Sequence, residues 1–341
     1  MTQVQFGIIG SGMIAGVIAR AIHQADGATL KAVASRRQEK AAAFAQEHHI
    51  PLVFTDWQQL VQSDDIDAVY VATPTAGREE ICMAVLEAGK HLISEKPFLN
   101  QGSVTRIAAL AKAKGLAFMD ATHFSHHPRT AEVIRRQQSE LGAVNRIRTS
   151  FFFPFMDREN IRFDPTKEPT GAVGDMAWYN LRAIVEYMQP NAEVHAINGL
   201  LRHDPQTGAV VGGAGLIAFT SGQSSSFDFG YDAGVCQMDL DIIGENGLIQ
   251  LDDYVLDWKD GFAFDHPDQV ASFRLRQGMA SPTEFIQQRV TTDRPQAVHM
   301  IQNFCDLISQ GQGEHRALAA RRAIHTQTLL DQFCQATGLS V

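Results

Sequence analysis

Cysteine is scarce in this sequence, and its arrangement excludes two kinds of site. The four cysteines stand at positions 82, 236, 305 and 334, with no CxxC pair and no regular spacing. This arrangement contains neither the ligand spacing of a structural zinc site nor the dense framework of a disulfide-stabilised domain. A reducing compartment is therefore the simpler expectation.

Long apolar runs and dense positive charge are also missing. No stretch reaches the roughly 18 consecutive apolar residues of a membrane-spanning helix, and the first residues lead into an apolar strand without a signal-peptide pattern. The 38 acidic side chains outnumber the 29 basic ones, which leaves a formal net charge of -9 and no Lys/Arg-dense block. Nucleic acid and anionic membranes would be repelled overall, so we expect a cytoplasmic protein that binds a small molecule.

The composition that remains is that of a folded globular protein. Of the 341 residues, 45% are hydrophobic and 20% are charged, which is close to the globular average. A disordered chain and a coiled coil are both excluded. The length corresponds to about two domains of ordinary size.

The first part of the chain alternates short apolar runs with segments of helical spacing. Continuous apolar runs are typical of strands buried on both faces of a parallel sheet. The runs are Val4 to Ile9, Leu30 to Ala34, Ala68 to Ala72, His91 to Ile93 and Leu116 to Met119. The helical segments are Met13 to Gln24, Arg36 to Glu47, Glu79 to Ala88 and Val104 to Lys114. This series predicts an α/β fold whose N-terminal domain, residues 1–122, is a Rossmann domain with a doubly wound parallel sheet.

Beyond residue 122 the pattern changes to period-two alternation, which is typical of strands with one buried face. Met238, Leu240 and Ile242 alternate with acidic residues, and Glu245-Asn246-Gly247 is a hairpin-type turn. The predicted strands are Val144 to Phe153, Glu193 to Leu201, Leu216 to Thr220, Ser225 to Tyr231, Cys236 to Ile243 and Leu248 to Leu251. We predict a C-terminal α+β domain, residues 123–341, with a large and mostly antiparallel sheet. A helix over 129–141 precedes the sheet, and a last helix over about 316–336 could pack on the first domain.

A glycine-rich turn follows the first predicted strand and opens the first predicted helix. It reads Gly10-Ser11-Gly12-Met13-Ile14-Ala15, a GxGxxA pattern. In such a turn the first glycine permits the tight bend, the second lets the backbone approach a pyrophosphate, and the alanine allows the helix to pack closely on the strand. We therefore expect Gly10, Gly12, Met13 and Ile14 to bind a dinucleotide at the positive end of the helix, with a bare structural turn as the alternative.

The segment after the second predicted strand bears on which dinucleotide is bound. Where an NAD enzyme carries an acidic residue for the ribose hydroxyls, this chain has Ser35-Arg36-Arg37. A hydroxyl and two guanidinium groups would donate charge-assisted hydrogen bonds to a 2′-phosphate, so Ser35, Arg36 and Arg37 favour NADP over NAD. The alternative is structural, because Ser35 and Gln38 also have the spacing of a capping box, with the arginines solvated in the first helical turn.

A Glu95-Lys96-Pro97 motif stands at the end of the fourth predicted strand, at the edge where open α/β sheets bind ligands. With the glycine turn before it, this motif resembles the Gfo/Idh/MocA oxidoreductases, and the resemblance covers nearly the whole chain. The other segments that carry it are Thr73-Pro74, Glu87 to His91, Asn160 to Pro165 and Gly171 to Asn180. The last segment looks like the family's glycine-rich start of a helix that bears Asp-x-x-x-His or, as here, Asp-x-x-x-Tyr. The tyrosine form resembles the branch of dihydrodiol dehydrogenase, glucose–fructose oxidoreductase and xylose dehydrogenase.

The resemblance implies functional residues in both domains. It places Lys96 near the nicotinamide, where it assists proton transfer, and it makes Tyr179 the candidate general acid/base. Asp175, four residues before Tyr179, would share its helix face and could orient a substrate hydroxyl or hold the lysine protonated. The residues also expected at the cofactor are Thr73, Pro74, Glu95 and Pro97, and those expected at the substrate are Arg162, Trp178 and His123.

The expected reaction explains why these residue types are needed. Hydride transfer from the C4 position of NADPH to a carbonyl leaves an oxyanion that must be stabilised and protonated. A phenol is a weak acid at neutral pH, and a neighbouring ammonium favours its ionised form and offers the oxyanion a positive charge. Structural alternatives exist for each residue: a surface ion pair of Lys96 with Glu95, a half-buried aromatic for Tyr179, and a first-turn acid at a helix start for Asp175.

Some residues depart from the family pattern or suggest other chemistry. Thr75 and Arg78 stand where the family often has Asn and His, and this concerns the nicotinamide side of the site. His123, His126 and His127 suggest a metal ion. No nearby Asp, Glu or Cys completes a recognisable ligand spacing, so we expect no metal site.

These observations lead to one main functional hypothesis and two alternatives. We expect an NAD(P)-dependent oxidoreductase, with NADP rather than NAD, that acts on CH-OH groups of a sugar, polyol or diol. The alternatives are a nucleotide-binding sensor without turnover, and glycoside chemistry by transient oxidation with tightly held NAD. By resemblance, the second-domain sheet has an open face through which a homodimer or a higher homo-oligomer would form.

Overall fold

The computed structural model describes residues 3–155, 157–259, 266–309 and 313–340. By its internal contacts the chain divides into two compact units, of which the first consists of Met1–His126 and Arg294–Ile324. The second consists of His127–Asp293 and His325–Val341. The sequence predicts a boundary at residue 122 and a last helix over about 316–336 that could pack on the first domain, but it does not anticipate that residues 294–309 group with the first unit. The last helix, α9 (Glu314–Ala336), has residues in both units.

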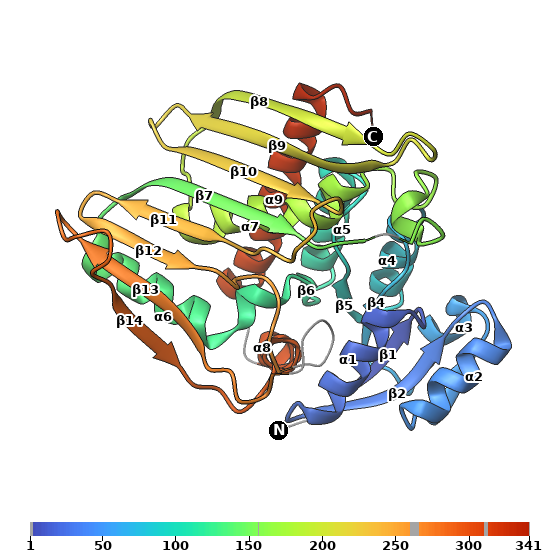
Figure 1. Ribbon diagram of the computed structural model, residues 1–341. Helices are drawn as coiled ribbons and strands as arrows, with labels where there is room; N and C mark the ends of the chain where they lie inside the picture. The colour runs from blue at the N-terminus through green and yellow to red at the C-terminus, as the bar shows by residue number, and fades with distance from the viewer. Residues whose placement is uncertain (1–2, 156, 260–265, 310–312, 341) are drawn as a thin grey trace. The chain divides into compact units, whose positions relative to one another are not determined.

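The first unit is built around a six-stranded sheet in the order β3-β2-β1-β4-β5-β6 (Figure 1). Every neighbouring pair in this sheet is parallel. The strands are β1 (Val4–Ile9), β2 (Ala28–Ala34), β3 (Leu52–Phe54), β4 (Ala68–Val71), β5 (His91–Ser94) and β6 (Phe118–Asp120). The helical segments are α1 (Met13–Gln24), α2 (Gln38–Glu47), α3 (Trp57–Val61), α4 (Arg78–Glu87), α5 (Gln101–Ala113), η1 (His123–His126) and α8 (Gln296–Ser309). The strand order reverses between β1 and β4, and open α/β sheets bind ligands at such a switch point.

The central strands of this sheet are apolar on both faces, as the sequence predicts for a parallel sheet between helices. All of β4 is buried, and in β1 only Gln5 is not. The predicted Rossmann topology is therefore confirmed. The prediction missed β3 and α3, because elements of 3 and 5 residues carry too little periodicity.

The second unit contains an eight-stranded sheet in the order β14-β13-β12-β11-β7-β10-β9-β8. Strands β7 and β10 are parallel and the other neighbouring pairs are antiparallel, so the predicted mostly antiparallel sheet is confirmed. The strands are β7 (Val144–Phe152), β8 (Val194–His203), β9 (Val210–Phe219), β10 (Ser224–Gly230), β11 (Leu240–Gly244), β12 (Gly247–Leu251), β13 (Ala271–Gln277) and β14 (Ile286–Val290). The helical segments are α6 (Pro128–Arg136), η2 (Gln137–Leu141), η3 (Ile161–Phe163), η4 (Val173–Ala177), α7 (Trp178–Ala183) and η5 (Ile184–Met188).

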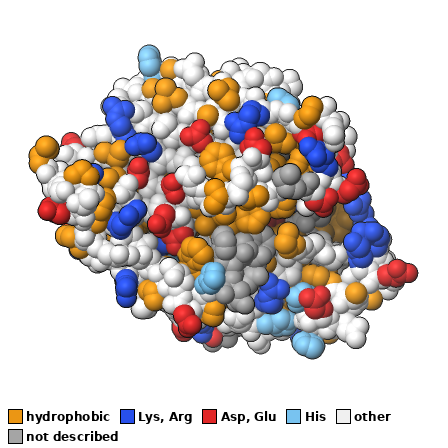
Figure 2. Space-filling model, in the orientation of Figure 1, with side chains coloured by type: hydrophobic (Ala, Val, Ile, Leu, Met, Phe, Trp, Pro, Cys, Tyr) orange, Lys and Arg blue, Asp and Glu red, His pale blue; other side chains and the backbone are white. Residues whose placement is uncertain are grey.

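One face of this second sheet is covered by helices and the other is open (Figure 1). The hairpin of β11 and β12 shows the alternation that produces the two faces. Asp241 and Gln250 lie on the open face, where the amide of Gln250 donates a hydrogen bond of 2.7 Å to Asp241. The residues on either side of them in the two strands are at most 4% exposed, and they are Leu240, Ile242, Ile249 and Leu251. Figure 2 shows hydrophobic, acidic and basic side chains interspersed over the visible face.

Glycines in β8 and β9 make room for aromatic rings under the sheet. A Cβ atom on Gly199 would lie 2.4 Å from the ring of Phe333 in α9, and one on Gly215 would lie 2.2 Å from the ring of Phe227. Both phenylalanines are at most 1% exposed, and their ring centroids are 5.1 Å apart in an edge-to-face contact. The small residues of these strands therefore serve the packing of the C-terminal part of α9.

Within the described ranges, no helix is long and apolar enough to cross a membrane. Helix α9 has sufficient length, with 23 residues. Charged side chains interrupt its apolar residues along its length, including Arg316, Arg322 and Asp331.

Candidate functional site

The glycine turn of the first unit joins three strands of the parallel sheet. The N–H of Gly10 donates a 2.9 Å hydrogen bond to the carbonyl of Ala34 at the end of β2. The φ angle of Gly10 is +118°, and a Cβ atom there would lie 2.8 Å from the carbonyl oxygen of Ala72, just after β4. Both the backbone conformation and the lack of space therefore require glycine at this position.

The start of α1 has the features of an anion site. Gly12 is the N-cap residue of α1, no side chain caps the helix, and its first turn contains no acidic residue. A Cβ atom on Gly12 would meet nothing within 4 Å, and the side chain of Met13 is 57% exposed. The first N–H groups of a helix have no partner within it, so a phosphate group can approach them here. The residues present therefore fit the pyrophosphate of a dinucleotide.

The predicted phosphate-binding residues lie next to this turn. The hydroxyl oxygens of Ser11 and Ser35 are 2.8 Å apart, which connects the glycine turn with the end of β2. Arg36 and Arg37 are both exposed. Helix α2 begins at Gln38 with Arg37 as its N-cap residue, so the alternative that Ser35 caps this helix is wrong. The chain leaves β2 and runs through Ser35 and the arginines before the helix begins, and a serine there does not reach the helix N–H groups.

The Glu95-Lys96-Pro97 motif exposes one side chain and buries its neighbours. From Leu92 to Phe98, Lys96 is the only residue that is not buried. Glu95 is 8% exposed, and its carboxylate accepts hydrogen bonds from the Tyr70 hydroxyl and, at 3.2 Å, from the N–H of Lys96. Burial raises the pKa of Glu95, although Lys96, Tyr70 and Arg78 oppose this shift. Glu95 is therefore a buried residue and not a surface residue, whatever its attraction to Lys96.

Thr73 and Pro74 follow β4, the strand beside β5. The side-chain oxygen of Thr73 is buried and has no hydrogen-bond partner among the described residues. A buried hydroxyl without a partner is costly, and a bound polar ligand would remove this cost. This observation agrees with the expected place of Thr73 at the cofactor. The Lys96–Pro97 peptide bond beside it is cis.

In the second unit, Asp175 and Tyr179 reach the same surface. Between Ala172 and Asn180 these two residues are the only ones that are not buried. The local conformation differs from the regular helix that the spacing predicts. Asp175 belongs to the π-helical segment η4, and Tyr179 belongs to the first turn of α7. Single π-helical turns occur frequently at functional sites.

A hydrogen-bond network fixes the carboxylate of Asp175. Its Oδ2 atom accepts hydrogen bonds from Arg162 Nε at 2.5 Å and from the Tyr231 hydroxyl at 3.1 Å. Burial lowers the pKa of Arg162, but the adjacent Asp175 carboxylate outweighs it and the net shift is upward. Burial and the same carboxylate raise the pKa of Tyr231 well above its usual range. Asp175 is therefore held as an oriented acceptor beside a permanent cation.

Aromatic contacts set the positions of Tyr179 and Arg162. The ring of Tyr179 meets Phe151 of β7 edge to face, with 5.3 Å between the centroids and an interplanar angle of 90°. The guanidinium of Arg162 lies 4.5 Å from the ring centroid of Phe155. Such contacts restrict the rotamers of both side chains, so a bound substrate would meet preorganised groups.

Two predicted substrate residues are largely buried. Trp178 is fully buried, and the guanidinium of Arg182 lies 5.7 Å from its ring, so its assignment to substrate contact is not supported. Neighbours on a helix point in different directions, and Tyr179 takes the surface direction. His123 lies in η1 of the first unit and is 9% exposed. Among the described residues, no group of three or more His, Cys, Asp or Glu could hold a metal ion.

Sequence reasoning missed three residues that build these sites. Tyr70 contacts Glu95, Tyr231 contacts Asp175, and Arg78 contacts the backbone around Lys96. Only Arg78 had a signal in the sequence, as a departure from the family pattern. The two tyrosines lie 25 and 56 residues from their partners, and no local motif includes them.

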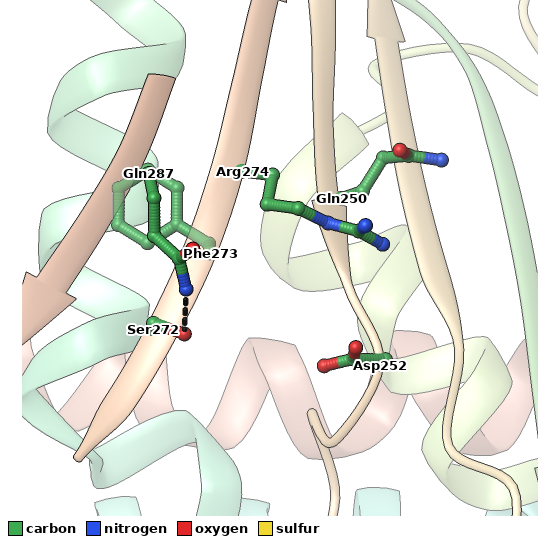
Figure 3. Close-up of a pocket in the computed structure, with 6 residues that line it drawn as sticks. All are labelled: Gln250, Asp252, Ser272, Phe273, Arg274 and Gln287. Carbon is green, nitrogen blue, oxygen red and sulfur yellow. Dashed lines mark hydrogen bonds between the residues drawn. The ribbon is translucent and has the colours of Figure 1, made fainter. Parts of the chain in front are cut away.

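A small polar pocket lies on the open face of the second-unit sheet (Figure 3). Its volume is about 200 Å³, and the amide of Gln287 donates a 3.0 Å hydrogen bond to the Ser272 hydroxyl in its wall. The lining residues are Gln250, Asp252, Ser272, Phe273, Arg274 and Gln287. None of the predicted site residues lines this pocket, and it does not enter the functional argument.

Curated relatives align with about two thirds of the chain. Residues 4–122 match a family described as an oxidoreductase family with an NAD-binding Rossmann fold. The dTDP-3,4-didehydro-2,6-dideoxy-alpha-D-glucose 3-reductase of Actinomadura kijaniata is 30% identical over 232 residues, which are 67% of this chain and 69% of that protein. The D-xylose 1-dehydrogenase (NADP(+)) 2 of Haloferax volcanii is 27% identical over 231 residues, which are 67% of this chain and 70% of that protein.

A solved structure extends the likeness of fold to nearly every residue. The crystal structure of KijD10, a 3-ketoreductase from Actinomadura kijaniata in complex with NADP and TDP-benzene, matches with a TM-score of 0.84. The match covers 98% of each chain at 22% sequence identity. At that identity the likeness concerns the fold alone.

Proposed function

The chain belongs to the Gfo/Idh/MocA family of oxidoreductases, and we propose that it uses NADP to interconvert an alcohol and a carbonyl on a sugar, polyol or diol. As a member of this family it is an NAD(P)-dependent oxidoreductase that acts on CH-OH groups. One observation supports the proposal most directly: the candidate catalytic side chains are partly exposed, while the other residues of their motifs are buried. These side chains are Lys96 in the first unit and Asp175 and Tyr179 in the second.

The preference for NADP rests on the segment after β2. Ser35 and the exposed Arg36 and Arg37 can donate charge-assisted hydrogen bonds to a 2′-phosphate. An NAD enzyme has a carboxylate here, which would repel that phosphate. The Ser11–Ser35 contact places the Ser35 hydroxyl beside the glycine turn, where the adenosine ribose of a dinucleotide lies in this fold. The similar xylose dehydrogenase carries NADP(+) in its name.

The proposed roles of the side chains follow from the charge that the reaction develops. The bound cofactor supplies the hydride, and the protein supplies protons and electrostatics. In the direction of reduction, the Tyr179 hydroxyl gives its proton to the carbonyl oxygen of the substrate as the carbonyl carbon receives the hydride. The role proposed for the Lys96 ammonium is to stabilise the negative charge that develops on the substrate oxygen. In oxidation the deprotonated tyrosine takes the alcohol proton.

Asp175 and Arg162 are proposed to orient the substrate rather than to transfer protons. The Arg162 guanidinium is a permanent cation, and its hydrogen bond with Asp175 favours the ionised carboxylate. A carboxylate in that state accepts hydrogen bonds from sugar hydroxyls without changing its protonation. This assignment replaces the expectation that Asp175 holds the lysine protonated.

A nucleotide-binding sensor is the second hypothesis, and it would use the glycine turn without a proton-transfer pair. Fluorescence titration with NADPH and NADH tests binding, and a screen of aldoses, polyols and diols with both oxidised cofactors tests turnover. We expect tighter binding of NADPH and oxidation of at least one sugar-like alcohol, with Lys96→Met as the inactive control. Binding without turnover over the whole panel would favour the sensor, and failure to bind either nucleotide would contradict the cofactor site.

We further propose that the protein forms a homodimer through the open face of the eight-stranded sheet and works in the cytoplasm. Exposed apolar side chains on the sheet support the first point, including Leu200 and Leu216, which are 57% and 50% exposed. Four free cysteines agree with a reducing compartment. Sedimentation velocity should give a dimer for the wild type and a monomer for Leu216→Lys. Dimers in both would place the interface elsewhere.

A further inference from the structure

Arg78 is a buried cation that holds the backbone on both sides of Lys96. It is the first residue of α4 and is 5% exposed. Its Nη1 atom donates hydrogen bonds of 2.7 Å to the carbonyl oxygens of both Glu95 and Pro97. Nε and Nη2 donate to the carbonyl oxygen of Thr73 at 2.8 and 2.6 Å. We infer that Arg78 is a positioning residue for Lys96, an inference that rests on the proposed role of this lysine in proton transfer.

The place of Arg78 in the sheet explains why such a residue is needed. The pairing of β4 with β5 ends at Val71 and Ser94, with one further hydrogen bond from the N–H of Glu95 to the Val71 carbonyl at 3.0 Å. Beyond that point the two chain segments have no ladder hydrogen bonds to each other. The guanidinium of Arg78 connects the two segments beyond that point, because it donates hydrogen bonds to carbonyl groups of both.

The geometry uses the full donor capacity of the side chain. A guanidinium has five N–H groups in a fixed planar fork. Together with the Nη2 contact of 3.4 Å to the Thr75 hydroxyl, each of these groups has an acceptor. A histidine has two ring nitrogens and a lysine has one nitrogen, so neither reproduces this set of contacts. Thr75 and Arg78, the two departures from the family pattern, are therefore parts of one arrangement.

The consequence for Lys96 is a main chain that is fixed on both sides of it. Glu95 and Pro97 are buried and tied to Arg78 through their carbonyl groups, while Lys96 between them stays partly exposed. A lysine side chain has many rotamers, so its ammonium can be placed reproducibly only if its Cα atom is fixed. Small displacements of a catalytic group are costly, since about 1 Å can reduce the rate by about 100-fold.

The test compares Arg78→Met and Arg78→Lys with Arg106→Met as a matched control. Arg106 also forms two guanidinium hydrogen bonds in this region, at 2.6 and 3.0 Å to Glu79 of α4, but its side chain is 58% exposed. Hydrogen exchange of the protein with and without NADPH is measured in peptides that cover residues 73–75 and 95–98. Turnover is measured in the direction of reduction, with the carbonyl product of the best alcohol of the screen as substrate, using NADPH and its 4-deuterated form to obtain the isotope effect.

We expect both Arg78 variants to exchange faster in these two segments and to lose kcat by about 10-fold to 100-fold, with a larger isotope effect and nearly unchanged NADPH affinity. Arg106→Met should match the wild type.

A merely structural role would lower the active fraction, which reduces the maximal rate but leaves the isotope effect and KM unchanged. That result, or wild-type exchange in both segments, would overturn the inference. If Lys96→Met itself kept full turnover, the proposed function of Lys96 would fail instead. Arg78→Lys keeps the positive charge, so the same measurements can be made on this variant if Arg78→Met does not fold.

Discussion

Replacing Tyr179 with phenylalanine is expected to lower kcat by about two to four orders of magnitude, the range for loss of a general acid/base. The ring of Tyr179 packs edge to face on Phe151, and phenylalanine keeps this contact. The variant therefore loses the hydroxyl and its proton while the packing is retained. NADPH affinity should change by less than about twofold, because the proposed cofactor contacts come from the first unit. Steady-state kinetics and fluorescence titration measure the two quantities.

The matched control for this prediction is Tyr187→Phe in the same unit. Tyr187 is 1% exposed, and its hydroxyl donates to Thr130 at 3.3 Å. Burial raises the pKa of Tyr187, so this phenol stays neutral and takes no part in proton transfer. Its loss should leave kcat within about twofold of the wild type. Equal losses in both variants would indicate a general packing defect, and wild-type turnover in Tyr179→Phe would remove this tyrosine from the mechanism.

The Rossmann domain was predictable because continuous apolar runs for its strands alternate with segments of helical spacing. The weaker predictions concern elements that are short or that contain few apolar residues. β14 reads Ile-Gln-Gln-Arg-Val and has no buried residue, so its pairing with β13 is invisible to a hydrophobic pattern. β13 is different, because Ala271, Phe273 and Leu275 are buried in alternation and the period-two signal was present in the sequence.

The candidate site was predictable in its local motifs and not in its networks. The family resemblance pointed to Asp175, Tyr179 and Lys96, and the spacing of four residues adds only that the first two would share a helix face. The partner of Asp175 on the sheet, Tyr231, follows only from the register that aligns the end of β10 with β7. Trp178 is fully buried. Adjacent residues of a helix lie about 100° apart around the axis, so Trp178 and Tyr179 point in different directions.

The cofactor preference is expected to reverse in the double variant Ser35→Asp with Arg36→Ala. The variant removes one guanidinium and one hydroxyl donor from the 2′-phosphate and adds a carboxylate that repels it. A charge-assisted hydrogen bond contributes about 1.5–3 kcal/mol, so NADPH affinity should fall by about 100-fold or more. The new carboxylate can accept hydrogen bonds from the ribose hydroxyls of NADH, whose affinity should therefore hold or rise. Fluorescence titration with both nucleotides gives the ratio.

The control for this reversal is Lys40→Ala, which removes an exposed cation from the same helix, α2. If the phosphate responds only to the general positive field near α2, Lys40→Ala and the double variant should lower NADPH affinity by similar factors, and both effects should shrink at high salt. If direct hydrogen bonds decide, Lys40→Ala should change affinity by less than about threefold and the double variant should differ from it by more than tenfold. An unchanged NADPH affinity in the double variant would show that the 2′-phosphate binds elsewhere. The proposal of hydride transfer would remain, because it depends on the glycine turn, Lys96 and Tyr179 and holds for either nucleotide.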